Sequence, residues 1–165
     1  MQNDKTINLV KAALFMALIT ISTVIIRIPS PTQGYVNLGD CFVILSAWLI
    51  GPAYGAIASG VGSLISDIIA GVPYYAIGSF FVKGIAALVC GLIFSKDKGI
   101  GNLIVSSTLC EIIVVLGYFG YSALIIGKGL AAALSIPGNL IQGALGIILA
   151  LAIYHLVKNT KVLRR

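Results

Sequence analysis

The sequence predicts an all-α integral membrane protein, built as one bundle of six transmembrane helices. Of the 165 residues, 59% are hydrophobic and only 10% are charged, and the mean hydropathy is +1.06. A water-soluble domain of this size has too large a surface-to-volume ratio to hide so many apolar side chains. Because a helix needs about 20 apolar residues to cross a bilayer, the length accommodates about six spans with short loops. We therefore expect residues 1–165 to form a single domain.

Breaks in the apolar pattern give the bounds of the predicted helices. Proline disfavours helix in the residue before it, so the first helix ends at Pro29-Ser30-Pro31. The later breaks are, in order, Gly51-Pro52, Gly71-Val72-Pro73, the polar loop 95–99 and the segment around Gly127-Lys128-Gly129. The six predicted helices cover residues 7–28, 39–50, 53–70, 75–94, 100–126 and 134–157. The second is short for a span, which leaves open whether it begins inside the polar stretch before it or leaves the membrane early.

Most of the basic residues fall on one side of this topology. Six crossings place both termini on the same side, together with the loop at 95–99. Eight of the eleven Lys and Arg residues lie there: Lys5, Lys11, Lys96, Lys98, Lys158, Lys161, Arg164 and Arg165. By the positive-inside rule, this bias predicts that both termini face the cytoplasm.

Four ionisable residues lie within or at the border of the predicted spans, on four different helices. Asp40, Asp67 and Lys83 fall near the outer side, and Glu111 lies about 16 Å along the fifth helix at 1.5 Å per residue. A charge left in lipid costs several kcal/mol, so these groups should face an internal cavity or one another. Glu111 has three possible roles: an ion pair with Lys83, a place in a wet binding site, or proton coupling.

Aromatic and amide side chains border the same outer half. Tyr74 and Tyr75 either form part of an interfacial aromatic belt or make a wall of a pocket that contains Lys83. Asn139 and Gln142 are three residues apart and therefore share one face of the sixth helix. They either hold helices together by hydrogen bonds or present donors and acceptors to a ligand.

Several chemistries have no support in the sequence. Cys41, Cys90 and Cys110 lie in separate apolar segments, and His155 is the single histidine, so we expect neither a disulfide nor a metal site. The chain has no phosphate-binding GxxxxGK[ST] loop and no catalytic motif, so we expect no ATP site, no cofactor and no enzymatic activity. The basic residues are not gathered on one face, which argues against nucleic acid.

Taken in order, the motifs make the chain resemble the substrate-binding (S) components of energy-coupling factor (ECF) vitamin transporters. The resemblance covers essentially the whole chain and is strongest for the riboflavin-transporter-like subfamily. An AxxxA pattern at Ala13 and Ala17 is weak alone, and the ordered set is more specific. The set continues with YVNLGD (35–40), GPAYG (51–55), SDIIAGVPYYA (66–76), FVKG (81–84), EIIVVLGYF (111–119) and PGN (137–139).

The resemblance implies a multi-pass protein of a prokaryotic plasma membrane that captures a vitamin or vitamin precursor outside the cell. A membrane-embedded coupling subunit would bind at Ala13 and Ala17, and a separate pair of ATPase subunits would drive delivery. The stretch at 33–40 would act as a lid, with Gly34 and Gly39 providing mobility and Asp40 at the rim. The substrate-binding candidates are Tyr35, Asn37, Asp40, Asp67, Tyr74, Tyr75, Lys83, Glu111, Asn139 and Gln142.

The balance of three acids against one deep lysine predicts a small polar ligand that is neutral or weakly basic. A hydroxymethylpyrimidine- or pyridoxine-like compound fits this description better than riboflavin. Two alternatives come from other classes: a self-sufficient proton-coupled secondary carrier that uses Glu111, and a membrane scaffold with a fully packed outer half.

Overall fold

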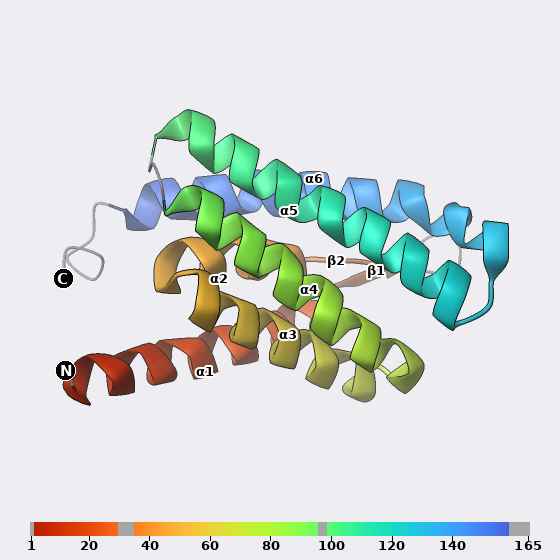
Figure 1. The fold of residues 1–165 in the computed structure, drawn as a ribbon, viewed down its shortest axis with the longest axis horizontal. Helices are drawn as coiled ribbons and strands as arrows, with labels where there is room; N and C mark the ends of the chain where they lie inside the picture. Colours follow the sequence, from red (N-terminus) through yellow and green to blue (C-terminus); the bar gives the residue numbers. More distant parts are fainter. Residues whose placement is uncertain (1, 30–34, 96–98, 159–165) are drawn as a thin grey trace.

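The computed structural model describes residues 2–29, 35–95 and 99–158, and in these ranges the chain is almost entirely helical (Figure 1). Two three-residue strands follow the first helix, and a π-helical turn and a 3-10 helix lie between the last two α-helices. The elements are α1 (Gln2–Ile25), β1 (Arg27–Pro29), β2 (Tyr35–Asn37), α2 (Gly39–Ile50), α3 (Pro52–Ile69), α4 (Pro73–Phe94), α5 (Ile100–Gly120), η1 (Tyr121–Ile125), η2 (Gly129–Ser135) and α6 (Ile136–Val157).

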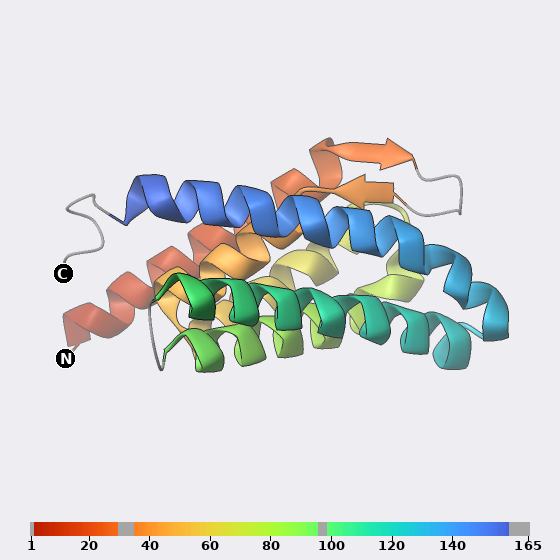
Figure 2. The same ribbon diagram turned by 90° about the horizontal axis from the view of Figure 1, so that it is seen from above.

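The helices run roughly along one long axis, and the connections gather at its two ends (Figures 1 and 2). The start of α1 and the end of α6 lie at one end, which we call the terminal end. The β1–β2 hairpin, the α3–α4 turn and η2 lie at the other, which we call the hairpin end. The predicted six-helix bundle is therefore confirmed for the described residues, with the first and last helices meeting at one end. That this end faces the cytoplasm stays a prediction.

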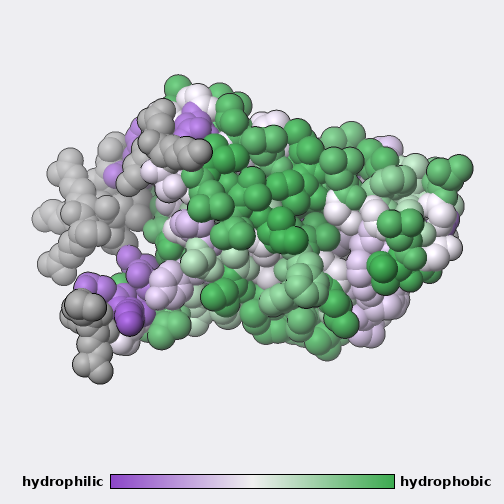
Figure 3. All heavy atoms as spheres, viewed as in Figure 1, coloured by the Kyte–Doolittle hydropathy of each residue, from purple (hydrophilic) through white to green (hydrophobic). Residues whose placement is uncertain are grey.

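Among the described residues, four helical segments are long and apolar enough to cross a membrane by themselves: Asp4–Ile25, Pro73–Phe94, Ile100–Ile125 and Gly129–Val157. α2 has only 12 residues, about 18 Å at 1.5 Å per residue. Most of its side chains are buried inside the bundle, so α2 needs no lipid-facing length. On the face seen in Figure 3, apolar residues cover the middle of the molecule and polar residues gather towards the terminal end.

The segment between α1 and α2 differs most from its prediction. α1 ends at Ile25, three residues before the predicted end, because residues 27–29 pair antiparallel with residues 35–37. Arg27 lies opposite Asn37 in this register. The predicted lid at 33–40 thus contains a strand and the first turn of α2, while Gly34 lies outside the described residues.

Gly39 serves close packing. A Cβ placed there would lie 2.2 Å from Thr23 Oγ1 on α1, so any side chain would clash. Glycine at this position lets α1 approach without displacing Thr23, and the predicted mobility at Gly39 has no support from its packing.

The predicted partner-contact residues lie on the outside of the bundle. Ala13 and Ala17 are both exposed on α1, next to the exposed side chains of Val10 and Leu14. The two alanines therefore face either lipid or another protein, and their role as a partner contact stays a prediction.

Candidate ligand-binding cavity

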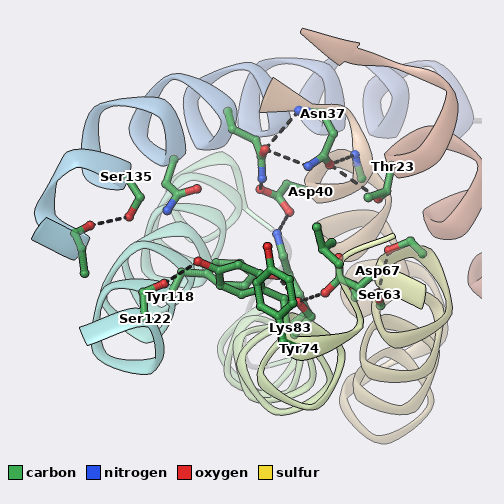
Figure 4. A pocket seen from close by; sticks show the side chains of 18 of the residues that line it. Thr23, Asn37, Asp40, Ser63, Asp67, Tyr74, Lys83, Tyr118, Ser122 and Ser135 are labelled. Atoms are coloured by element: carbon green, nitrogen blue, oxygen red, sulfur yellow. Dashed lines mark hydrogen bonds and ion pairs between the residues drawn. The ribbon is translucent and has the colours of Figure 1, made fainter. Parts of the chain in front are cut away.

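A cavity of about 610 Å³ opens at the hairpin end of the bundle (Figure 4). Exposed side chains such as Tyr74 and Lys128 stand at its mouth, and buried ones such as Asp40 and Lys83 form its inner wall. Its polar lining is formed by Thr23, Asn37, Asp40, Ser63, Ser66, Asp67, Tyr74, Tyr75, Ser79, Lys83, Tyr118, Ser122, Lys128, Ser135, Asn139 and Gln142. Every α-helix contributes to the cavity, although these residues are spread over most of the sequence.

A network centred on Asp40 joins four elements along the inner wall. Asp40, on the first turn of α2, is fully buried and forms an ion pair with Lys83 of α4. Its second oxygen, Oδ2, accepts a hydrogen bond from Gln142 Nε2 at 2.7 Å. Gln142 Oε1 in turn accepts from the side-chain amide of Asn37 at 2.9 Å. Because a buried charge must be paired and hydrogen-bonded, this network keeps both ions stable inside the bundle.

A second network lies beside the first, on the side of α3 and α5. Ser79 Oγ donates to Asp67 Oδ2 and lies 2.7 Å from the hydroxyl oxygen of Tyr118. The ammonium of Lys83 lies 5.5 Å from the centre of the Tyr118 ring, within the range of a cation–π contact. Tyr118 therefore connects the two networks, one through its hydroxyl and the other through its ring.

Tyrosine rings dominate the mouth of the cavity. The rings of Tyr74 and Tyr75 have centroids 5.0 Å apart, and Tyr75 lies 6.3 Å from Tyr118. The hydroxyl of Tyr75 is 2.9 Å from Ser122 Oγ, and the ammonium of Lys128 lies 5.8 Å from the centre of the Tyr75 ring. The arrangement offers an aromatic surface with hydroxyl groups at its edge, which suits a flat polar molecule.

The structure brings together all but two of the predicted site residues. Tyr35 has its backbone in β2, but its side chain lies outside the described residues. Glu111 does not line this cavity. Its Oε2 atom lies against Gly143, where α5 meets α6, and it borders a separate crevice of about 350 Å³. Lys83 pairs with Asp40, whereas the sequence had left a pair with Glu111 open.

The position of Asp40 also differs from the prediction. The sequence placed it at the rim of the pocket, since it opens α2 at the predicted outer surface. In the structure α6 covers it, because Gln142 donates to its Oδ2 and Gly146 packs directly against its Cβ. Asp40 therefore belongs to the inner wall.

Sequence reasoning missed the small hydroxyl residues and Tyr118. Ser63 and Ser66 are three residues apart on α3, and Tyr118 and Ser122 are four apart near the end of α5. Both spacings place the pairs on one helix face, which was a usable signal. Lys128, missed as well, changes the balance of charge: two acids and two lysines line the cavity, in place of the predicted three acids and one lysine.

Comparisons with known proteins agree on one family. A family model described as "ECF-type riboflavin transporter, S component" matches residues 3–159. An uncharacterized protein of Pyrococcus woesei is 33% identical over 142 residues, which cover 86% of this chain and 95% of the relative. The thiamine precursor transporter HmpT of Lactococcus lactis subsp. cremoris is 27% identical over 136 residues, which cover 82% of this chain and 77% of that protein.

A solved structure has the same fold. The S component of a bacterial ECF transporter superimposes with a TM-score of 0.71 and 22% sequence identity, covering 96% of this chain and 98% of that chain.

Proposed function

Because the chain belongs to the family of ECF-type riboflavin transporter S components, we propose that it binds one vitamin or vitamin precursor in the cavity at the hairpin end and delivers it inward. Members of this family are the vitamin-binding subunits of membrane transporters and are not enzymes. A single observation carries the assignment of the site: a cavity of about 610 Å³ with many polar lining residues lies inside a bundle that exposes many large apolar side chains. Small-molecule sites fall in the range of about 300–1,000 Å³.

The proposed substrate is a small aromatic vitamin precursor of the hydroxymethylpyrimidine or pyridoxine type. The likeness to a thiamine precursor transporter supports the first of these. The lining offers such a ring three kinds of contact: the faces of Tyr75 and Tyr118, the half-buried amide of Asn139, and serine hydroxyls. Because two acids and two lysines line the cavity, a neutral polar molecule fits it better than a polyanion.

Delivery is proposed to need partners. The exposed Ala13 and Ala17 of α1 would allow the close approach of a helix from a coupling subunit, as small residues do in membranes. Hydrolysis of ATP would occur in a separate pair of ATPase subunits. The protein would act in the prokaryotic plasma membrane, with both termini in the cytoplasm.

Mass spectrometry of small molecules that co-purify with the detergent-solubilised protein tests the substrate directly. Binding of hydroxymethylpyrimidine, pyridoxine, riboflavin and thiamine to the emptied protein should then rank hydroxymethylpyrimidine or pyridoxine first. Tight binding of only a phosphorylated or dianionic compound would contradict the proposed substrate class.

One observation favours a second candidate, the proton-coupled carrier: both oxygens of Glu111 are buried without a hydrogen-bond partner in the described part of the chain. Vesicles that contain this protein alone separate the two functions. Uptake driven by a proton gradient and abolished by Glu111→Gln would support the carrier. Uptake that requires added coupling and ATPase subunits would support the binding subunit.

A further inference from the structure

Glu111 is a buried acid that the cavity does not use. Its side chain is 6% exposed, and neither carboxyl oxygen has a hydrogen-bond partner among the described residues. An ionised carboxylate in such surroundings costs several kcal/mol unless a cation or a donor pairs with it. Burial without a partner therefore favours the neutral, protonated acid.

Glu111 and Asp40 pack on the same face of α6, one turn apart. A Cβ at Gly143 would lie 2.8 Å from Glu111 Oε2, and a Cβ at Gly146 would lie 3.0 Å from Asp40 Cβ. Three residues separate these glycines, which is about 4.5 Å along a helix and close to one side of it. Two glycines of α6 thus admit two acids, one from α5 and one from α2, next to each other.

The ammonium of Lys83 lies against Asp40, and Glu111 is the second acid whose charge acts on it. The ammonium pairs with Asp40 and also contacts the ring of Tyr118. Glu111 precedes Tyr118 by two helical turns and so faces the same way on α5. The charges of Lys83 and Glu111 act on each other, and the other titratable groups near Glu111 are the thiols of Cys90 and Cys110. A flexible lysine side chain with several rotatable bonds needs no backbone movement to turn from one acid to the other.

We propose that Lys83 exchanges between two carboxyl groups: it pairs with Asp40 in the ligand-free protein and with Glu111 when a ligand engages Asp40. Glu111 holds a proton in the first state. In the second state that proton leaves to solvent, Glu111 is ionised beside Lys83, and Asp40 is free to accept hydrogen bonds from the ligand. One proton is therefore released for each ligand bound.

The exchange removes a specific cost of binding. A ligand that displaces Lys83 from Asp40 would otherwise leave a buried ammonium unpaired, and removing one partner of a buried pair is strongly destabilising. With Glu111 as the alternative partner, the ammonium of Lys83 is paired with a carboxylate in both states. Glu111 is thus a positioning residue that acts through Lys83 without touching the ligand. That a ligand drives the exchange rests on the proposed function, whereas the exchange itself rests on the packing of α2, α4, α5 and α6.

Infrared spectroscopy of the ligand-free protein in nanodiscs tests the exchange without any ligand. We expect a carbonyl band of a protonated carboxyl group that is missing from the nearly isosteric Glu111→Gln variant. Asp40→Asn frees Lys83, so the Glu111 band should fall about tenfold or more, because an adjacent cation favours the ionised form of a carboxyl by that factor. Asp4→Asn removes an exposed acid at the terminal end of α1 and should leave the band in place.

Two infrared results would overturn the exchange. If the wild-type protein lacks the Glu111 band, the acid is already ionised. This result does not depend on whether the Asp40→Asn variant folds. An undiminished band in folded Asp40→Asn protein would show that Lys83 does not turn.

Calorimetry tests the use of the exchange by a ligand. Titration of hydroxymethylpyrimidine in buffers of different ionisation enthalpy should report about one proton released per molecule bound, and none in Glu111→Gln. Binding without proton release would overturn this use. If neither hydroxymethylpyrimidine nor pyridoxine binds, the proposed substrate fails while the infrared result still decides the exchange.

Discussion

Asn37 of β2 and Gln142 of α6 are joined by two hydrogen bonds to one oxygen atom. The backbone N–H of Asn37 donates to Gln142 Oε1 at 3.0 Å, and its side-chain amide donates to the same oxygen at 2.9 Å. Because the amide nitrogen of Gln142 also donates to Asp40, this one side chain links the hairpin to the inner wall of the cavity. Gln142 therefore determines how firmly β2 is held beside the site.

Replacing Gln142 by leucine should release the hairpin. Gln142→Leu removes three hydrogen bonds and leaves Oδ2 of Asp40 without this donor, which we expect to cost about 1–3 kcal/mol of stability. Hydrogen exchange at the backbone amides of residues 35–37 should accelerate, as measured by mass spectrometry. Asn139→Leu is the matched control, since it replaces an amide on the same helix face and should leave that exchange unchanged. Equal exchange in wild-type and Gln142→Leu protein would contradict the role of Gln142.

The Asp40–Lys83 pair should show strong coupling in thermal unfolding. Lys83→Met leaves a buried carboxylate without its cation, and breaking a buried pair in this way costs about 3–5 kcal/mol. The double variant Asp40→Asn/Lys83→Met carries no unpaired charge at this position and should recover much of the loss. Melting temperatures of the two single variants and the double variant in one detergent provide the measurement. Additive losses would show that the two groups do not depend on each other.

The sequence was sufficient to locate the helices because apolar runs and Pro or Gly breaks are local signals. Pro52 and Pro73 start α3 and α4 in the structure, within two residues of the predicted starts. The hairpin was missed because each strand has three residues, too few for an alternating pattern to appear. The backbone pairing of Arg27 with Asn37 joins residues on either side of a segment whose sequence predicts a loop.

The site could be predicted by the side of each helix that carries polar residues but not by how deep the cavity extends. Tyr118 lines the cavity, whereas Glu111, two turns earlier on the same side of α5, lies against Gly143 of α6. How far the cavity extends between α5 and α6 depends on how closely the two helices approach, and close glycine contacts fix that approach. Which glycines make such contacts can be learned only from the folded structure.

Glycine-to-alanine substitutions should separate contact glycines from the others. A Cβ at Gly91 would lie 2.7 Å from Cα of Pro52, which is backbone and cannot move aside cheaply, whereas at Gly101 nothing lies within 4 Å. Gly91→Ala should therefore lower stability by about 1–3 kcal/mol through overpacking. Gly101→Ala should be neutral or raise it by up to about 1 kcal/mol, since alanine favours helix. Thermal unfolding of both variants tests this, and equal melting temperatures would contradict the packing.

The mouth of the cavity offers a tyrosine and a lysine to the same ligand, and we expect the tyrosine to contribute more binding free energy than the lysine. Tyr75→Ala should weaken binding of hydroxymethylpyrimidine by up to about tenfold, because an aromatic pair contributes about 0.5–1.5 kcal/mol beyond buried area. Tyr75→Phe keeps the ring and loses the hydroxyl contacts with Ser122 and Lys128, so its affinity should stay closer to wild type. Lys128 is exposed, and salt screens exposed charges. Lys128→Ala should therefore change the affinity for a neutral ring by less than about threefold. Equilibrium binding at low and high salt measures all three variants. A large loss in Lys128→Ala that grows at low salt would instead show that the cavity selects an anion.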